Sequence, residues 1–109
     1  MIRILVAEDH AIFCEGLRRV FEFANDMELV DVARNGREVL ETIAGGGHDI
    51  LLLDLSMPSP NGVELIKRIR DEAPRLPILV LTVHDEIEMA SRVIRAGAAG
   101  YLTKDGEPE

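Results

Sequence analysis

Five side chains suited to phosphoryl chemistry stand at or just beyond the ends of hydrophobic runs: Glu8, Asp9, Asp54, Thr82 and Lys104. Carboxylates held together repel one another, and burial adds the cost of removing them from water, so three of them at one point favour a divalent cation. Oxygen ligands with few protein carboxylates suit Mg²⁺, which keeps several waters and accepts phosphate oxygens. Asp54 ends an aliphatic run and is therefore the most rigidly placed of the three acids. A carboxylate so placed can attack phosphorus and form an acyl phosphate.

The other groups complete this chemistry, because phosphoryl transfer requires little more than positioning and charge neutralisation. Glu8 and Asp9 could hold the cation, the Lys104 ammonium could supply a second positive charge, and the Thr82 hydroxyl could donate a hydrogen bond to a phosphoryl oxygen. Taken singly, each has an ordinary explanation: an acid at a strand end caps a helix, and a threonine fits any strand. Only the combination indicates a site.

The elements that must position these groups alternate between two hydrophobic patterns. Apolar residues at helical spacing predict amphipathic helices, and short aliphatic runs predict strands. Four consecutive aliphatic residues before Asp54 predict a strand that is buried on both faces. Asn35 is a suitable N-cap with Glu38 three residues later, and Gly45 is a natural terminator of that helix. The predicted elements are strands at 2–7, 28–33, 49–54, 77–82 and 99–102, and helices at 11–24, 36–44, 63–73 and 87–96.

This alternation predicts an α/β fold: a flavodoxin-like, doubly wound parallel sheet of five strands in the order 2-1-3-4-5. The carboxyl ends of the strands then meet at one edge, where the five groups converge. A helix after the fifth strand would normally cover part of one face, and it is missing from this chain. We therefore expect exposed apolar surface near Phe13, Leu17 and Val20, with self-association or reduced stability. We place one domain at 1–105, with 106–109 beginning a linker or a truncated last helix.

Composition excludes several classes of protein. The 109 residues carry a formal net charge of −8, which opposes binding of nucleic acid by this segment. The longest aliphatic stretches are too short to cross a bilayer, and Met1 leads directly into a strand-like run, so we expect a cytoplasmic location. Cys14 is the only cysteine, which rules out an intramolecular disulfide. The three histidines (His10, His48 and His84) are too dispersed to predict a metal cluster.

The motifs as a set resemble the receiver domains of two-component response regulators, over nearly the whole chain. Among these, the chain is most similar to the NarL/FixJ class, whose members usually carry a C-terminal LuxR-type helix-turn-helix domain. One departure is Asp105, where many receivers have a proline after the lysine. The segments that carry the resemblance are Glu8-Asp9-His10, 51–58 (LLLDLSMP), Asn61-Gly62, 79–82 (LVLT) and 97–104 (GAAGYLTK).

The resemblance implies a Mg²⁺-dependent signalling switch rather than a metabolic enzyme. Asp54 would be phosphorylated by a sensor histidine kinase, and the domain would catalyse only its own phosphorylation and dephosphorylation. The Ser56 carbonyl would join Glu8, Asp9 and Asp54 as a metal ligand. Lys104 would sense the phosphate, and Thr82 and Tyr101 would form the switch pair. Activation would produce a homodimer and would control DNA only through the missing C-terminal domain, with no membrane partner.

Three other readings stay open at this stage. A pseudo-receiver would share the fold without phosphorylation, but it would usually lack the acidic pocket or the lysine, and this chain has both. A flavodoxin-like cofactor binder would need a phosphate-cradling loop after the first strand, where this chain is acidic. A haloacid-dehalogenase-type phosphatase would need a second acid two residues after the nucleophile, where this chain has Ser56.

Overall fold

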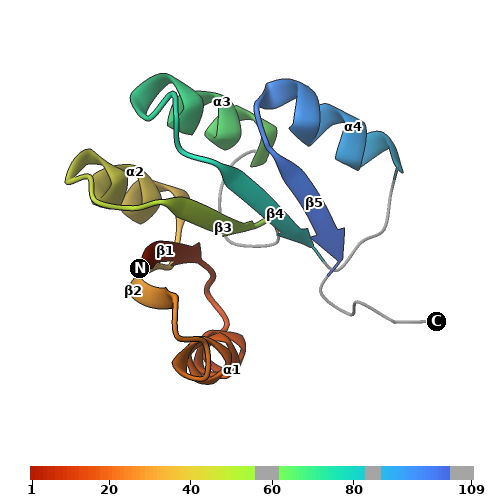
Figure 1. Cartoon of the computed structure of the whole chain (residues 1–109). Helices are drawn as coiled ribbons and strands as arrows, with labels where there is room; N and C mark the ends of the chain where they lie inside the picture. Colours follow the sequence, from red (N-terminus) through yellow and green to blue (C-terminus); the bar gives the residue numbers. More distant parts are fainter. Residues whose placement is uncertain (56–61, 83–86, 104–109) are drawn as a thin grey trace.

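The computed structural model describes residues 1–55, 62–82 and 87–103, and in these ranges strands and helices alternate as predicted (Figure 1). All strands pair in parallel, in the order β2-β1-β3-β4-β5. The predicted flavodoxin-like topology is confirmed, whereas the predicted domain boundary at residue 105 lies outside the described residues. The elements are β1 (Ile2–Ala7), α1 (Ala11–Glu22), β2 (Met27–Ala33), α2 (Gly36–Ala44), β3 (Ile50–Asp54), α3 (Gly62–Glu72), β4 (Ile78–Thr82), α4 (Ile87–Ala96) and β5 (Gly100–Thr103).

Local sequence signals explain the start of α2 and the end of α4. The Asn35 side chain accepts a hydrogen bond from the Glu38 backbone N–H at 2.9 Å, which confirms the predicted N-cap of α2. Gly97 follows α4 with φ of +126°, a conformation that residues with a side chain rarely adopt. The first helix ends at Glu22, two residues earlier than predicted. The backbone N–H of Phe23 bonds to the carbonyl three residues earlier, which tightens the last turn and ends the α-helix.

Two hydrophobic clusters lie on opposite faces of the sheet. Figure 1 shows α2, α3 and α4 on one face and α1 alone on the other. The larger cluster includes Leu53, Ile66 and Val80 and is packed under the three helices. The smaller cluster lies on the α1 face and consists of Ile4, Val6, Leu29, Leu52 and Leu81, with Phe13, Leu17 and Phe21 of α1 packed against it. The strands are therefore covered on both faces at β1 and β3, where the candidate acids emerge.

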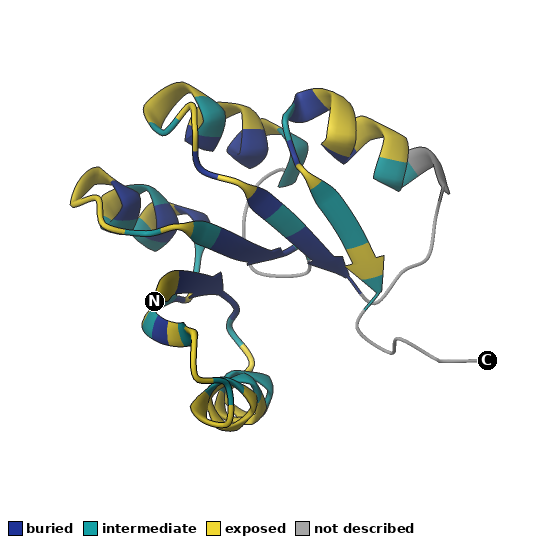
Figure 2. Cartoon of the chain, in the orientation of Figure 1, coloured by how far each residue is buried: buried dark blue, intermediate teal, exposed yellow. Residues whose placement is uncertain are grey.

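Coverage of the α1 face is incomplete, as predicted. Val20 is 61% exposed, whereas Phe13 and Leu17 are half-buried against the smaller cluster. Ile12 and Phe23 are also exposed, and α1 contains no buried residue (Figure 2). None of the helices in the described ranges has the length and hydrophobicity needed to span a bilayer.

Candidate functional site

The buried polar side chains of the described residues gather at the carboxyl ends of adjacent strands. Glu8, Asp54 and Thr82 are 1%, 1% and 3% exposed. The register pairs Ala7 with Leu53, so Glu8 and Asp54 each stand one residue further along neighbouring strands. Thr82 ends β4, on the other side of β3 from β1. The predicted convergence of β1, β3 and β4 is confirmed for these three residues.

Glu8, Asp9, His10 and Asp54 form a tight group that we call the acidic cluster. Each offers one ligand atom, and these atoms all lie within 4.8 Å of one another. Glu8 and Asp54 are buried, the side chain of Asp9 is 30% exposed, and that of His10 is 60% exposed. The cluster is therefore buried at Glu8 and Asp54 and accessible to solvent on the side of Asp9 and His10.

His10 is the member that reasoning from the sequence missed. The three histidines are dispersed along the chain, but His10 directly follows the two acids and reaches back over them. Its Nδ1 lies 2.5 Å from Glu8 Oε2, 3.4 Å from Asp9 Oδ1 and 4.0 Å from Asp54 Oδ2. The Glu8 carboxylate also accepts the backbone N–H of His10 at 3.1 Å. Its position directly beside two candidate ligands was the signal available in the sequence.

The donor set of the acidic cluster fits a divalent cation. Three carboxylates that share so small a space repel one another, and the burial of Glu8 and Asp54 prevents water from screening that repulsion. Asp9 Oδ1 is buried, and among the described residues it accepts no hydrogen bond. A buried carboxylate oxygen in that situation is costly unless a cation satisfies it. Glu8, Asp9 and Asp54 could therefore bind a metal ion.

The remaining predicted residues are only partly placed. Thr82 is buried at the end of β4, and Tyr101 is half-buried in β5, packed against the larger core cluster. Ser56, Lys104 and His84 lie outside the described residues. The structure thus brings together the carboxylates and Thr82, while the roles of these residues, like those of Ser56, Lys104 and Tyr101, stay predictions.

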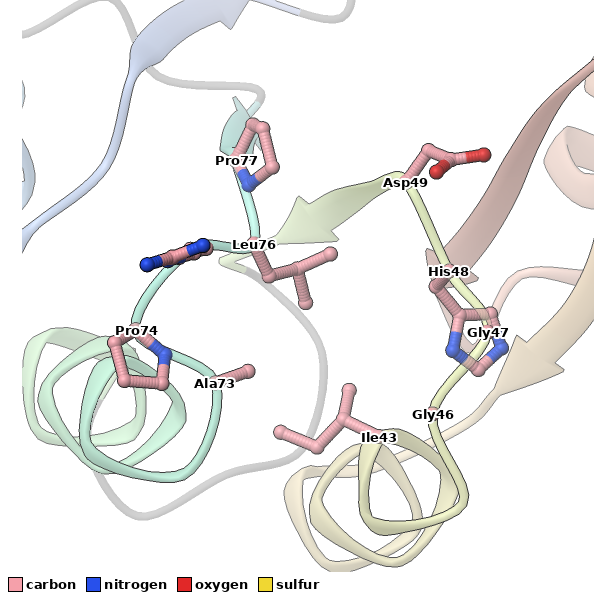
Figure 3. A pocket seen from close by; sticks show the side chains of 10 residues that line it. Ile43, Gly46, Gly47, His48, Asp49, Ala73, Pro74, Leu76 and Pro77 are labelled. Atoms are coloured by element: carbon pink, nitrogen blue, oxygen red, sulfur yellow. The ribbon is translucent and has the colours of Figure 1, made fainter.

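A hollow of about 440 Å³ lies at the opposite edge of the sheet, near the amino ends of β3 and β4 (Figure 3). Ile43, Ala73, Pro74, Leu76 and Pro77 form its mainly apolar wall. Ligands of open α/β sheets bind beyond the carboxyl ends of the strands, and this hollow is at the other end. The size of this hollow therefore does not identify the functional site. The chemistry of the acidic cluster identifies it instead.

Comparison with known proteins agrees with the fold. A family model described as the response regulator receiver domain matches residues 4–109. The chain is 34% identical to the response regulator UvrY of Escherichia coli over 109 residues, which are 100% of this chain and 50% of UvrY. It spans about half the length of the curated relatives it matches.

Solved structures give the same result in three dimensions. A LuxR-family two-component response regulator from Aurantimonas superposes with a TM-score of 0.87 at 34% identity, covering 94% of this chain and 73% of that one. A response regulator from Burkholderia pseudomallei has a TM-score of 0.86 at 29% identity, covering 98% of this chain and 62% of that one. The Burkholderia structure contains a phosphorylated aspartic acid, a calcium ion and citrate.

Proposed function

This chain belongs to the response regulator receiver domain family, and from that we propose that Asp54 accepts a phosphoryl group from a sensor histidine kinase. Receiver domains of two-component systems are regulatory and work with histidine kinases, and the relatives of this chain are LuxR-type regulators. One observation carries the assignment to Asp54: it is the buried carboxylate at the end of the central strand, beside two further acids.

The proposed step needs only positioning from the protein. A carboxylate oxygen of Asp54 attacks phosphorus, an O–P bond forms, and the P–N bond to the kinase histidine breaks as its electron pair returns to the imidazole. Burial of Asp54 in a strand paired on both sides restricts its carboxylate to a narrow range of positions. Hydrolysis of the acyl phosphate later returns the carboxylate and releases inorganic phosphate.

The acidic cluster makes this step dependent on a divalent cation. Glu8, Asp9 and Asp54 would hold Mg²⁺, with the Ser56 carbonyl as a further oxygen ligand. When bound, Mg²⁺ supplies positive charge that offsets the carboxylates and the phosphoryl oxygens. Lys104 would contribute the second positive charge. The calcium ion and phosphorylated aspartic acid of the Burkholderia regulator support the same pairing of cation and phosphoryl group here.

The phosphoryl group would act as a switch by favouring one of two conformations. The Thr82 hydroxyl would donate a hydrogen bond to a phosphoryl oxygen, and Tyr101 would follow it inward. Such a shift is only as large as the difference in contacts between the two states. The output would be homodimerisation in the cytoplasm and control of a C-terminal LuxR-type DNA-binding domain, in keeping with the double length of the relatives.

Intact-mass spectrometry after incubation with Mg²⁺ and acetyl phosphate tests the proposal. We expect a gain of one phosphoryl group that is lost on chelation of Mg²⁺ and in Asp54→Asn. Asp49→Asn is the matched control, because Asp49 is an exposed acid just before the opposite end of β3. It should gain the group as the wild type does. No gain by the wild type, or an equal gain by Asp54→Asn, would refute the proposal and favour a binding module of the same fold.

A further inference from the structure

We propose that Arg70 is a positioning residue for the switch: through the carbonyl of Gly97 it fixes the start of β5, the edge strand that carries Tyr101. The inference deepens the proposed function, because it rests on Tyr101 responding to the phosphoryl group. It adds to that switch a residue of α3, which lies outside the acidic cluster. It starts from a side chain that bonds to the backbone at the ends of two helices.

The guanidinium of Arg70 joins the carboxyl ends of two neighbouring helices. Its Nη1 donates to the carbonyls of Ala73 and Pro74 at 3.2 and 2.9 Å, just beyond the end of α3. Its Nη2 donates at 2.7 Å to the carbonyl of Gly97, which follows α4. The carboxyl end of a helix presents unpaired carbonyls and partial negative charge, so one cation stabilises both ends. Figure 1 shows α3 and α4 side by side on the same face of the sheet.

The backbone of Gly97 leaves room for this contact. A Cβ added at Gly97 would lie 3.0 Å from Arg70 Nε and 3.4 Å from Arg70 Cγ. The arginine therefore occupies the space that a side chain at position 97 would need. Arg70 is half-buried there, and Gly97 is 27 residues away in the chain. The contact thus fixes the position of the turn between α4 and β5 relative to α3, rather than the local shape of α3.

The start of β5 depends on this turn, because burial of the strand's own side chains does not fix it. β5 lies at an edge of the sheet and pairs with β4. None of its four residues is buried, whereas β4 buries four of its five. The strand is entered through a backbone bond from the Ala99 N–H to the Ile78 carbonyl, at 2.8 Å. Gly97 comes two residues earlier, so Arg70 anchors the chain where it leaves α4.

Tyr101 lies close enough to this anchor to respond to it. It is the second residue of β5, it pairs with Val80, and its side chain is half-buried against the larger core cluster. The direction of a strand side chain follows from the register of its strand. Loss of the bond from Arg70 to Gly97 should therefore loosen the strand and change how far the Tyr101 ring is exposed.

The test uses Tyr101 as its own reporter, because the chain contains one tyrosine and no tryptophan. Acrylamide quenching of the tyrosine fluorescence is compared in wild type, Arg70→Gln and Arg70→Lys without metal and without denaturant. We expect quenching of Arg70→Gln to be on the order of twofold stronger, since a loosened edge strand exposes the ring. Arg70→Lys keeps the positive charge but not the fork of donors, so its quenching should lie between the two.

Two controls separate this effect from lost charge and from lost stability. Arg68→Gln removes a positive charge at an exposed position of the same helix, and Asn35→Ala removes the N-cap of α2. Both should be quenched as the wild type is. The inference fails if Arg70→Gln is quenched no more than wild type, or if Asn35→Ala is quenched as strongly as Arg70→Gln. Arg70→Lys decides the question if Arg70→Gln does not fold.

A second readout connects Arg70 to the switch. The phosphoryl mimic beryllofluoride, added with Mg²⁺, should change the Tyr101 fluorescence of the wild type. We expect the change in Arg70→Gln to be at most about half as large, because its ring already occupies several positions before the mimic binds. A change of full size in Arg70→Gln would overturn the link to the switch. No change in the wild type would instead refute the proposed response of Tyr101, and the quenching would still decide whether Arg70 fixes β5.

Discussion

Neutralising Asp54 should stabilise the metal-free protein although it removes the proposed phosphorylation site. Asp54 shares a space of 4.8 Å with the carboxylates of Glu8 and Asp9, and both Asp54 and Glu8 are buried. At an effective dielectric constant of about 20, two charges 4.8 Å apart repel by about 3.5 kcal/mol. Water at the exposed side of the cluster, where Asp9 and His10 lie, reduces this figure. We expect Asp54→Asn to raise the free energy of unfolding by about 1–3 kcal/mol.

Urea denaturation with EDTA and with excess Mg²⁺ measures this effect. With a urea dependence of about 1–3 kcal/mol/M, the midpoint of Asp54→Asn in EDTA should lie about 1 M above that of wild type. Mg²⁺ at a hundred times its dissociation constant should stabilise the wild type by about 2.7 kcal/mol and should stabilise the variant less, since the variant lacks one ligand charge. The difference between the two proteins should therefore shrink or reverse in Mg²⁺.

A matched variant separates this effect from a change in net charge. Asp26→Asn removes one negative charge at an exposed position between α1 and β2. It should change the free energy of unfolding by less than about 0.5 kcal/mol, because exposed charges interact weakly in water. If Asp54→Asn unfolds in EDTA at the same urea concentration as wild type, or at a lower one, the carboxylates do not repel one another as the geometry implies, and the argument for a cation fails.

Three further predictions concern the elements that support the site. Asn35→Ala removes the N-cap of α2 and should cost about 1 kcal/mol, seen as a fall of about 4–8 °C in Tm. Gly97→Ala should lower the free energy of unfolding, measured in urea, by about 1–3 kcal/mol, since φ is +126° and a Cβ would lie 3.0 Å from Arg70 Nε. Gly16→Ala is the control: a Cβ there meets nothing in the middle of α1, so the variant should raise the free energy of unfolding by about 0.5–1 kcal/mol. Phe23→Ser at the exposed end of α1 should reduce self-association in light scattering, and a wild type that stays monomeric at high micromolar concentration would contradict this prediction.

The order of elements and most of the carboxylate site could be predicted from local patterns. The aliphatic run before Asp54 can be satisfied only by a strand covered on both faces, and such strands alternate here with amphipathic helices. Parallel strands joined by helices place their carboxyl ends at one edge, so residues far apart in sequence had to converge there. Glu8, Asp54 and Thr82 were predictable for that reason.

Other features depend on contacts that no local pattern encodes. The predicted length of α1 was wrong by two residues, because backbone hydrogen bonds of the last turn, rather than hydrophobic spacing, end the helix. The sequence predicted that Phe13, Leu17 and Val20 could not all be covered, but it did not show which of them would be. Phe13 and Leu17 pack against the smaller cluster, and Val20 remains in solvent. Spacing shows which side chains share a helix face, but not how closely that face approaches the sheet.

Sequence by itself thus determined the alternation of elements, the strand order and the three acids, because each follows from hydrophobic periodicity and from the geometry of parallel sheets. Only the tertiary structure decided that His10 belongs with them. The direction of its ring depends on the turn between β1 and α1 and on the attraction of carboxylates from two different strands. These contacts exist together only after folding has brought Glu8 and Asp54 side by side, so the sequence placed His10 next to Glu8 and Asp9 but could not show that its ring also lies near Asp54.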